Sequence, residues 1–178
     1  MSLYSNMLKN RGITLIELLV VITIIGILAS VVIASLGVAR TKARDTAVKS
    51  QTEQLRKQAE IFHSYNSSYT GTGAAFNQDS MGECIGPGTA GTMLSPTASY
   101  GIASLLQGAY DNSAGSPSGF RVFCAIYPLS WAFAMPLHNP TGTNTGWCVD
   151  SQGAAKEVAL NFNNVGNPLT SGSEARCP

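Results

Sequence analysis

One acidic side chain lies inside an otherwise apolar segment near the start of the chain. Glu17 follows Gly12-Ile13-Thr14-Leu15-Ile16 and precedes an uncharged run from residue 18 to residue 38. A carboxylate among apolar groups costs several kcal/mol unless it is protonated or paired with a positive charge. We therefore expect Glu17 to have a proton or a cation as its partner, and the surrounding elements must bring the two together.

The other residues with distinctive chemistry are four cysteines, all beyond residue 80. Their spacing includes no Cys-x-x-Cys pair, and the histidines are His63 and His138, so no zinc site is expected. Two disulfides in an oxidising compartment are the better interpretation, with three possible pairings. No nucleophile–histidine–acid, paired-carboxylate or phosphate-loop arrangement stands out, so we expect neither catalysis nor a cofactor. The cysteines are Cys84, Cys124, Cys148 and Cys177.

Length and charge limit the function classes. With 178 residues, the chain suffices for one domain and an appended segment. Residues 1–66 carry eight Lys or Arg against four acids, and residues 67–178 carry three against six. Residues 67–178 therefore lack the excess of Lys and Arg that binding to nucleic acid requires. Their low charge and their abundant Gly, Ser, Thr and Asn favour an extracytoplasmic surface.

The uncharged run is long enough to cross a membrane. As a helix, its 21 residues would extend about 32 Å, close to the roughly 30 Å of a bilayer core. A secretory signal peptide is an alternative, but its apolar core would be shorter, roughly 7 to 15 residues, and would not contain Glu17. A plain anchor explains the length but not the acid, and a buried soluble helix explains neither the length nor the basic flank. Basic residues flank the apolar run on both sides, so charge does not decide which way the helix crosses the membrane. The cysteines decide it, because disulfides persist in an oxidising compartment, and we expect the C-terminal part on the outside.

The helix should continue beyond the apolar run as an amphipathic half. Neither Pro nor Gly occurs between Val38 and Asn66, so we predict one helix of about 50 residues. Apolar residues recur there at spacings near three, four and seven, and charged residues fill the other face. The predicted apolar stripe comprises Val48, Leu55, Ile61, Phe62 and Tyr65, with Ala43, Ala47 and Ala59 between them.

The sequence of the distal part, residues 67–178, predicts a small antiparallel sheet. A Gly/Ser/Thr-rich loop with one short helix at 99–108 comes first, and apolar runs broken by Pro and Gly follow. The predicted strands are 120–127, 131–137, 146–149 and 157–162. Packed on the amphipathic helix, such a sheet gives an α+β fold in the form of a lollipop.

The predicted strand order bears on the disulfides. Cys124 and Cys148 fall on strands that a middle strand should separate, and two strand spacings of about 9.6 Å exceed the reach of a disulfide. We therefore favour Cys84 with Cys124, and Cys148 with Cys177, the second bridge fastening the C-terminal tail.

The N-terminal pattern resembles the type IV pilin and pseudopilin family of filament subunits. The resemblance rests on Gly12-Ile13-Thr14-Leu15-Ile16-Glu17 after a basic leader and before the apolar run; residues 146–158 (GWCVDSQGAAKEV) resemble a C-terminal strand region of such proteins. It implies cleavage after Gly12 by a prepilin peptidase and methylation of the new amine of Ile13. The expected division is leader 1–12, membrane and filament-core helix 13–38, amphipathic half 39–66, αβ-loop 67–119, and sheet with disulfide-fastened tail 120–178.

The resemblance also implies the role and partners of the chain. It would be a structural subunit of a type IV pilus or of a type II secretion-like filament, with Glu17 paired to the N-terminal amine of a neighbouring subunit. Its partners would be copies of itself, minor pilins, the peptidase and an inner-membrane assembly platform. The precursor would span the inner membrane once with its C-terminus outside, and the mature protein would be in an extracellular or periplasmic filament. Adhesion, motility, DNA uptake and secretion all fit the residues.

A different function class stays open from the sequence. The chain could be a membrane-anchored or secreted extracytoplasmic binding domain, whose apolar segment is an ordinary anchor or signal peptide. The mature N-terminus distinguishes the two: Ile13 supports the filament subunit, and a start near Leu36 supports a signal peptide.

Overall fold

The structure, a computed structural model, describes residues 12–78, 84, 90–114, 122–143, 145–162, 168–171 and 174–178. The chain divides into two units, residues 1–39 and residues 40–178. Lys9 and Arg11 of the expected basic leader lie outside the described residues.

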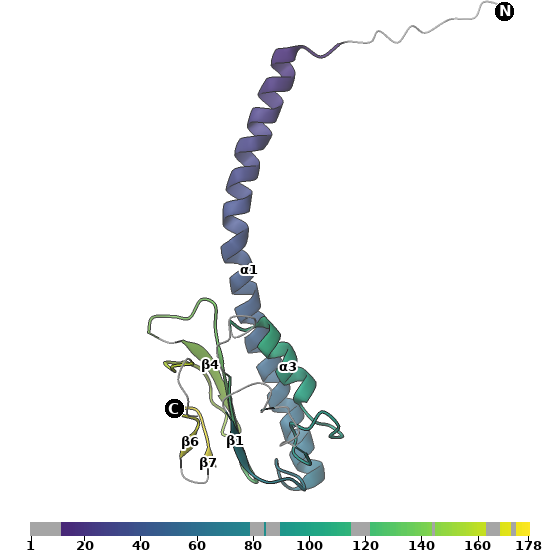
Figure 1. Ribbon diagram of the computed structural model, residues 1–178, viewed down its shortest axis with the longest axis vertical. Coiled ribbons are helices and arrows are strands. Elements are labelled where there is room, and N and C mark those ends of the chain that lie inside the picture. Colours follow the sequence, from purple (N-terminus) through teal and green to yellow (C-terminus); the bar gives the residue numbers. More distant parts are fainter. Residues whose placement is uncertain are drawn as a thin grey trace, which may run out of the picture. The chain divides into compact units, whose positions relative to one another are not determined.

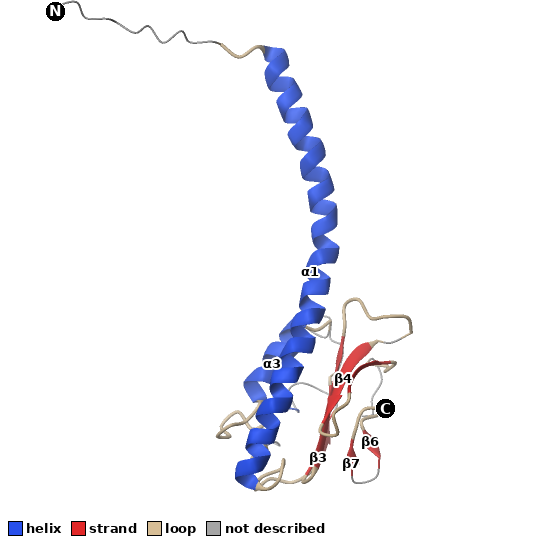
Figure 2. Ribbon diagram, turned by 180° about the vertical axis from the view of Figure 1, so that it is seen from behind, coloured by secondary structure: helices blue, strands red, loops and turns tan. Residues whose placement is uncertain are grey.

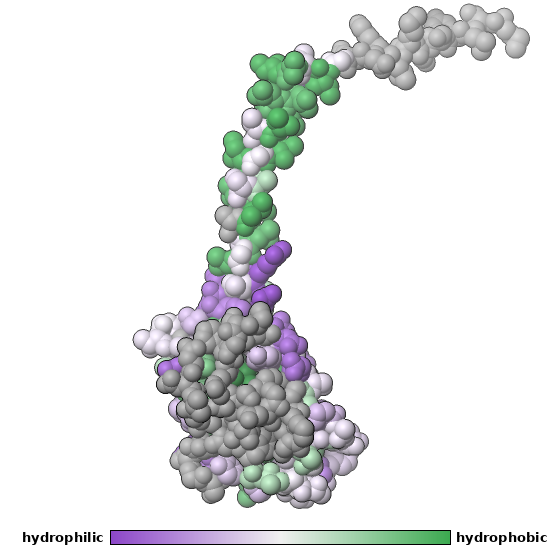
Figure 3. Space-filling view, viewed as in Figure 1, coloured by the Kyte–Doolittle hydropathy of each residue, from purple (hydrophilic) through white to green (hydrophobic). Residues whose placement is uncertain are grey.

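A single long helix, α1, covers Leu15–Asn66 and confirms the predicted N-terminal helix (Figure 1). In the first unit its large apolar side chains are exposed, from 43% at Leu36 to 87% at Leu15. Figure 3 shows hydrophobic side chains along much of the visible side of this segment. Such a surface is stable in water only when something else covers it.

The second unit contains a five-stranded antiparallel sheet in the order β1-β2-β3-β4-β5. Figure 2 shows strands of this sheet, β3 and β4 among them. A short hairpin of two strands, β6 and β7, lies nearer the C-terminus, and helix α3 precedes β2. The α+β class is therefore confirmed. The bounds are β1 Phe76–Gln78, α3 Ala103–Asn112, β2 Phe123–Tyr127, β3 Ser130–Pro136, β4 Gly146–Asp150, β5 Ala155–Val158, β6 Thr170–Ser171 and β7 Glu174–Ala175.

One stripe of α1 packs on the sheet within the second unit. The buried positions alternate by three and four residues, which keeps them on one face of a helix. Ile61 and Tyr65, predicted on this stripe, are 42% and 66% exposed, because they lie off that face. Two polar residues that the prediction omitted lie on it instead. The buried stripe is Asp45, Val48, Thr52, Leu55, Ala59 and Phe62, and its apolar members share a core with Trp131, Phe133, Met135 and Val149.

The opposite face of the sheet is covered by the C-terminal part of the chain. A second core cluster joins Phe123, Ala132 and Cys148 to Leu169 and Ala175 of the tail. Figure 1 shows β6 and β7 on the side of the sheet away from α1. Every residue of β3 is consequently buried, which explains why its sequence, SWAFAMP, lacks the alternation of a half-exposed strand.

Two predicted elements are shifted along the chain. The strand predicted at 157–162 is β5 at Ala155–Val158, because a tight turn after β4 brings Ala155 opposite Val149. Asp150 closes that turn by accepting hydrogen bonds from the N–H groups of Gln152 and Ala154. The predicted helix at 99–108 is α3 at 103–112. The structure also adds β1, which lies inside the segment predicted as a loop.

Both disulfides join the cysteines in the favoured pairing. Cys84 is bonded to Cys124 of β2, with 6.1 Å between their Cα atoms. Cys148 of β4 is bonded to Cys177, with 5.8 Å between their Cα atoms. The backbone N–H of Cys177 also donates to the buried carboxylate of Asp150, at 3.0 Å. The second bridge and this hydrogen bond together hold the tail against the sheet.

A group of ionic and hydrogen-bonded contacts, which we call the polar clasp, ties α1 to the loop between β3 and β4. The two carboxylate oxygens of Asp45 accept from the N–H groups of His138 and Asn139, both at 2.8 Å. Lys49 Nζ lies 2.9 Å from Glu157 Oε1, and Glu157 Oε2 accepts from the backbone N–H and the hydroxyl of Thr141. The clasp fixes the part of the loop that carries no regular hydrogen-bond ladder.

Candidate functional site

The residues that could do chemistry in the first unit gather at the start of α1. Gly12 and Ile13 precede the helix, and Ile13 is 77% exposed. The carbonyl of Thr14 accepts from Leu18 N–H at 3.2 Å, which makes Thr14 the N-cap residue. Glu17 lies in the first helical turn. The structure thus brings Ile13, Thr14 and Glu17 into one short segment.

Thr14 and Glu17 form a reciprocal cap. The backbone N–H and the hydroxyl of Thr14 donate to Glu17 Oε2, at 2.8 and 2.9 Å. In return, Glu17 N–H donates to the Thr14 hydroxyl at 3.3 Å. This is a capping box, which satisfies N–H groups that the first turn of a helix leaves without partners. The sequence prediction assigned no role to Thr14, although the Thr-x-x-Glu spacing is the recognised signal for this motif.

The cap leaves part of the Glu17 carboxylate available. Both bonds from Thr14 reach Oε2, and Oε1 has no hydrogen-bond partner among the described residues. Neither the Lys49–Glu157 ion pair nor the Glu53–Arg56 ion pair involves Glu17. The cap fixes the orientation of the carboxylate, and its free oxygen can accept from a cation outside the chain.

The helix that carries Glu17 can cross a membrane by its length and composition. The most apolar stretch of this helix is strongly hydrophobic, and none of it is buried within the structure. The hydroxyl groups in this segment are satisfied locally, which lowers the cost of placing them in an apolar medium. Thr23, Ser30 and Ser35 donate to the carbonyls of Val20, Ile27 and Val32, at 2.8, 2.7 and 3.0 Å.

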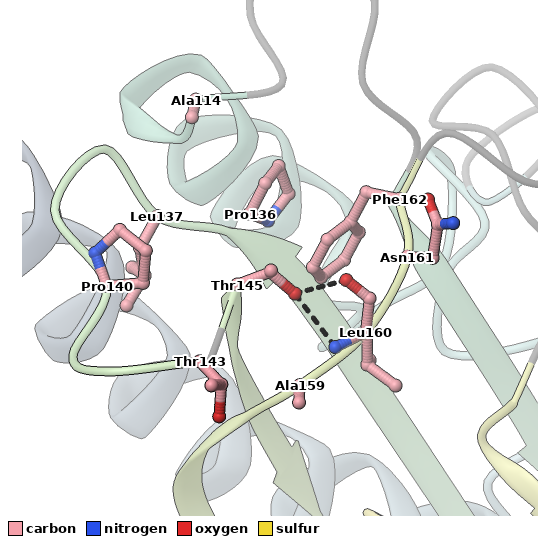
Figure 4. A pocket seen from close by; sticks show the side chains of 10 residues that line it. All are labelled: Ala114, Pro136, Leu137, Pro140, Thr143, Thr145, Ala159, Leu160, Asn161 and Phe162. Carbon is pink, nitrogen blue, oxygen red and sulfur yellow. Dashed lines mark hydrogen bonds between the residues drawn. The ribbon is translucent and has the colours of Figure 1, made fainter.

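A cavity of about 510 Å³ in the second unit is a competing candidate (Figure 4). The hydroxyl of Thr145 in its wall is bonded to the backbone N–H and carbonyl of Leu160. Its ten lining residues include no acid, base or cysteine, so they offer no catalytic group. They are Ala114, Pro136, Leu137, Pro140, Thr143, Thr145, Ala159, Leu160, Asn161 and Phe162.

No metal centre is formed by the described residues. No three His, Cys, Asp or Glu side chains among them are grouped so that they could hold an ion. His63 packs against the ring of Tyr69, with 4.5 Å between the ring centroids. His138 belongs to the loop held by Asp45.

Among the comparisons with known proteins, the match to a family model falls at the same end of the chain. The family model of the prokaryotic N-terminal methylation motif matches residues 7–33. The chain is 48% identical over 65 residues to the type IV wide pilus major component PilA4 of Thermus thermophilus. That alignment covers 36% of this chain and 50% of the relative, so the chain spans about half the length of the curated relative it matches. No solved structure matches the chain.

Proposed function

We propose that this chain is a type IV pilin, a structural subunit that polymerises into a filament through the apolar half of α1; the match to the N-terminal methylation motif and the similarity to a pilus component support the proposal. The observation that carries the proposal is the uncovered apolar surface from Leu15 to Val38 with a single carboxylate, Glu17, at its start. Identical helices packed side by side would cover that surface, and the burial would supply most of the free energy of assembly.

In this proposal the precursor is cleaved between Gly12 and Ile13 by a prepilin peptidase. The structure supports an accessible scissile bond, because both residues are exposed and precede the first helical turn. Cleavage leaves a positive amine on Ile13, and methylation of that amine keeps its charge. The leader 1–12 would be removed, and the filament-core helix would begin at Ile13.

The amine of one subunit then pairs with Glu17 of another. Thr14 holds Glu17 Oε2, and the free Oε1 faces no cation of its own chain among the described residues. A charge pair in an apolar filament core contributes little net stability, but an unpaired carboxylate there is strongly disfavoured. Glu17 therefore selects the register in which each carboxylate meets an amine, and Thr14 is its positioning residue.

The proposal also sets the topology of the precursor. The segment 18–38 would span the inner membrane, with residues 40–178 on the outside, where the two disulfides can persist. An assembly platform in the inner membrane would extract the subunit into an extracellular or periplasmic filament. Minor pilins would be further partners. The low charge of residues 67–178 fits a structural subunit better than a nucleic-acid receptor.

The mature N-terminus is the first test. Mass spectrometry of the protein from sheared cells should find Ile13 as the first residue, carrying a methyl group. A mature start near Leu36 would instead support a secreted binding domain and would overturn the proposal, and an uncleaved chain that keeps residues 1–12 in the membrane would do the same.

Variants of Glu17 test its pairing. We expect Glu17→Val to insert into the membrane at the normal level but to be absent from filaments. Glu17→Asp, which keeps the charge on a shorter side chain, should retain more assembly than Glu17→Gln, which keeps the shape without the charge. Electron microscopy and immunoblots of membrane and sheared fractions give the two readouts. Normal filaments from Glu17→Val would refute the pairing.

A further inference from the structure

Two tyrosines form an exposed stack at the C-terminal end of α1. The rings of Tyr65, on α1, and Tyr100, on the loop before α3, lie with centroids 4.5 Å apart and planes only 4° apart. They are nevertheless 66% and 51% exposed. Tyrosines that serve the core bury their rings, as Tyr69 does at 5% exposure. The two rings cover each other's facing sides, and their outer sides are left open to the outside.

The backbone at this stack adopts a conformation that side chains disfavour. Tyr100 has φ of 61° and Ser67, two residues after Tyr65, has φ of 56°; among the described residues other than glycine, only these two have positive φ. For a bulky residue such as tyrosine, this conformation is a true outlier. Outliers of this kind persist where the surrounding structure holds them, and they cluster at functional sites.

The surroundings of Tyr100 do hold it in place. Its carbonyl accepts from Gln58 Nε2 on α1 at 2.9 Å. The turn beside it is closed by Gly101 N–H donating to Ala98 at 3.1 Å and by Ile102 N–H donating to Met93 at 2.7 Å. The backbone that carries the ring is thus held in place before any ligand arrives, which reduces the entropy cost of binding.

The two segments that carry the stacked tyrosines contain no acidic residue, lysine or arginine. Residues 61–70 and 90–102 include no Asp, Glu, Lys or Arg. Exposed small polar side chains adjoin the two tyrosines in sequence instead, namely Ser64, Asn66, Ser67, Thr97 and Ser99. Tyr with Ser and Asn is the composition of adaptable binding surfaces, in which rings supply contact area and small polar groups supply hydrogen bonds. Nucleic acids and other polyanions require Lys or Arg, which these segments lack.

We propose that Tyr65 and Tyr100, with the uncharged polar residues beside them, form a binding site for the sugar rings of a neutral polysaccharide. A pyranose ring has an apolar C–H face that packs on a tyrosine ring, and its hydroxyls match the hydroxyl and amide groups around the stack. We call this surface the tyrosine platform. The inference goes beyond the filament role and does not depend on it, because the platform belongs entirely to residues 40–178.

The test uses the full chain in detergent micelles and measures binding by saturation-transfer NMR and titration calorimetry. The neutral probes are hexasaccharides of β-1,4-linked glucose, α-1,4-linked glucose and β-1,4-linked N-acetylglucosamine. The anionic probes are hexagalacturonate and a thymidine oligonucleotide. We expect at least one neutral hexasaccharide to bind, with saturation transferred to the protons of its sugar rings. We expect neither anionic probe to bind more tightly than that hexasaccharide.

Variants separate the rings from the fold. Tyr65→Ala and Tyr100→Ala should each weaken binding by about tenfold. Tyr100→Gly removes the ring while suiting the positive φ, so it should bind as weakly as Tyr100→Ala without a lowered Tm. Leu129→Ala removes another exposed side chain, 77% exposed on the β2–β3 turn, and should bind normally.

Three results would overturn the proposal. The first is that none of the neutral hexasaccharides binds. The second is that an anionic probe binds more tightly than the neutral hexasaccharides. The third is that Tyr65→Ala and Tyr100→Ala both keep the sugar affinity of the parent. If those variants kept the sugar affinity but lost filaments, the platform would be a contact between subunits instead. Loss of sugar binding with normal filaments would support the platform, and an unprocessed N-terminus would affect only the filament proposal.

Discussion

The hydroxyl and the backbone N–H of Thr14 donate to the same carboxylate oxygen of Glu17, at 2.9 and 2.8 Å. One residue therefore begins the helix and orients the acid that the filament proposal requires. Because the cap uses only Oε2, capping by Thr14 and pairing of Glu17 with an external amine can occur together. In the filament proposal, the start of α1 and the register of assembly would thus be linked through a single side chain.

Loss of the Thr14 hydroxyl should loosen the first turn of α1. Replacing an N-cap Thr by Ala costs about 1 kcal/mol of helix stability, and Ser restores the hydroxyl. In the full chain in micelles, Thr14→Ala should therefore accelerate amide exchange at residues 15–18, while Thr14→Ser should behave like the parent. Filament yield should fall in the same order. Equal exchange rates in all three proteins would contradict the role of the cap.

The buried carboxylate of Asp45 should be sensitive to neutralisation. Asp45 is 7% exposed and accepts from two N–H groups; Asn offers one oxygen, so one N–H of the loop would lose its partner. We expect Asp45→Asn to lower the free energy of unfolding by about 1–3 kcal/mol. Denaturant titration followed by tryptophan fluorescence measures it. Glu53→Gln, which removes a partly exposed ion pair at 3.9 Å, is the control and should cost less than about 1 kcal/mol.

The polar clasp should give the protein a pH dependence in acid. Hydrogen bonds from the Thr141 hydroxyl, Lys49 and the Thr141 N–H lower the pKa of Glu157 from 4.5 to about 2. A lowered pKa in the folded state means that this stabilisation is complete above pH 4.5 and is lost as the pH falls towards 2. The difference in unfolding free energy between the parent and Glu157→Gln should shrink across that window. A constant difference from pH 7 to pH 2 would contradict the assignment.

Replacing either of two glycines by alanine should change the stability of the protein in different directions. A Cβ on Gly146, at the start of β4, would lie 2.4 Å from the Met135 carbonyl oxygen and 2.4 Å from a ring carbon of Phe162. Gly146→Ala should therefore destabilise the protein by roughly 1–3 kcal/mol. Gly108 lies inside α3, where a Cβ would meet the flexible amide of Gln51 at 3.3 Å. Gly108→Ala should be neutral or stabilising by up to about 1 kcal/mol, since alanine favours the helix. Thermal unfolding of both variants decides the comparison.

The sequence predicted the elements with strong patterns and missed those set by tertiary contacts. The uncharged run and the absence of Pro and Gly after it were enough to predict α1, whose last residue is Asn66. The three longer strands followed from aromatic and β-branched runs between turn residues. β1 has only three residues and no alternating pattern, so nothing in its own sequence distinguishes it from a loop.

The prediction of the buried stripe on α1, which used hydrophobicity alone, was partly wrong. Asp45 and Thr52 are buried because partners far along the chain satisfy them: Asp45 caps the loop at His138, and the Thr52 hydroxyl accepts from Trp147 Nε1 at 3.1 Å. Ile61 and Tyr65 were assigned to the stripe because they are apolar, yet their phase on the helix points them elsewhere. At the candidate site the sequence identified Glu17, whereas the part played by Thr14 emerged from the hydrogen bonds around it.

The spacing of the buried stripe on α1 has a geometric consequence for the second unit. Alternating steps of three and four average 3.5 residues per turn, slightly fewer than the 3.6 of a straight helix. The line of contact therefore drifts around the helix axis by about 20° for every seven residues, or roughly 50° between Asp45 and Phe62. A surface that packs along this line must follow its drift around the helix axis. The natural twist of β-strands is what allows one continuous core to form there.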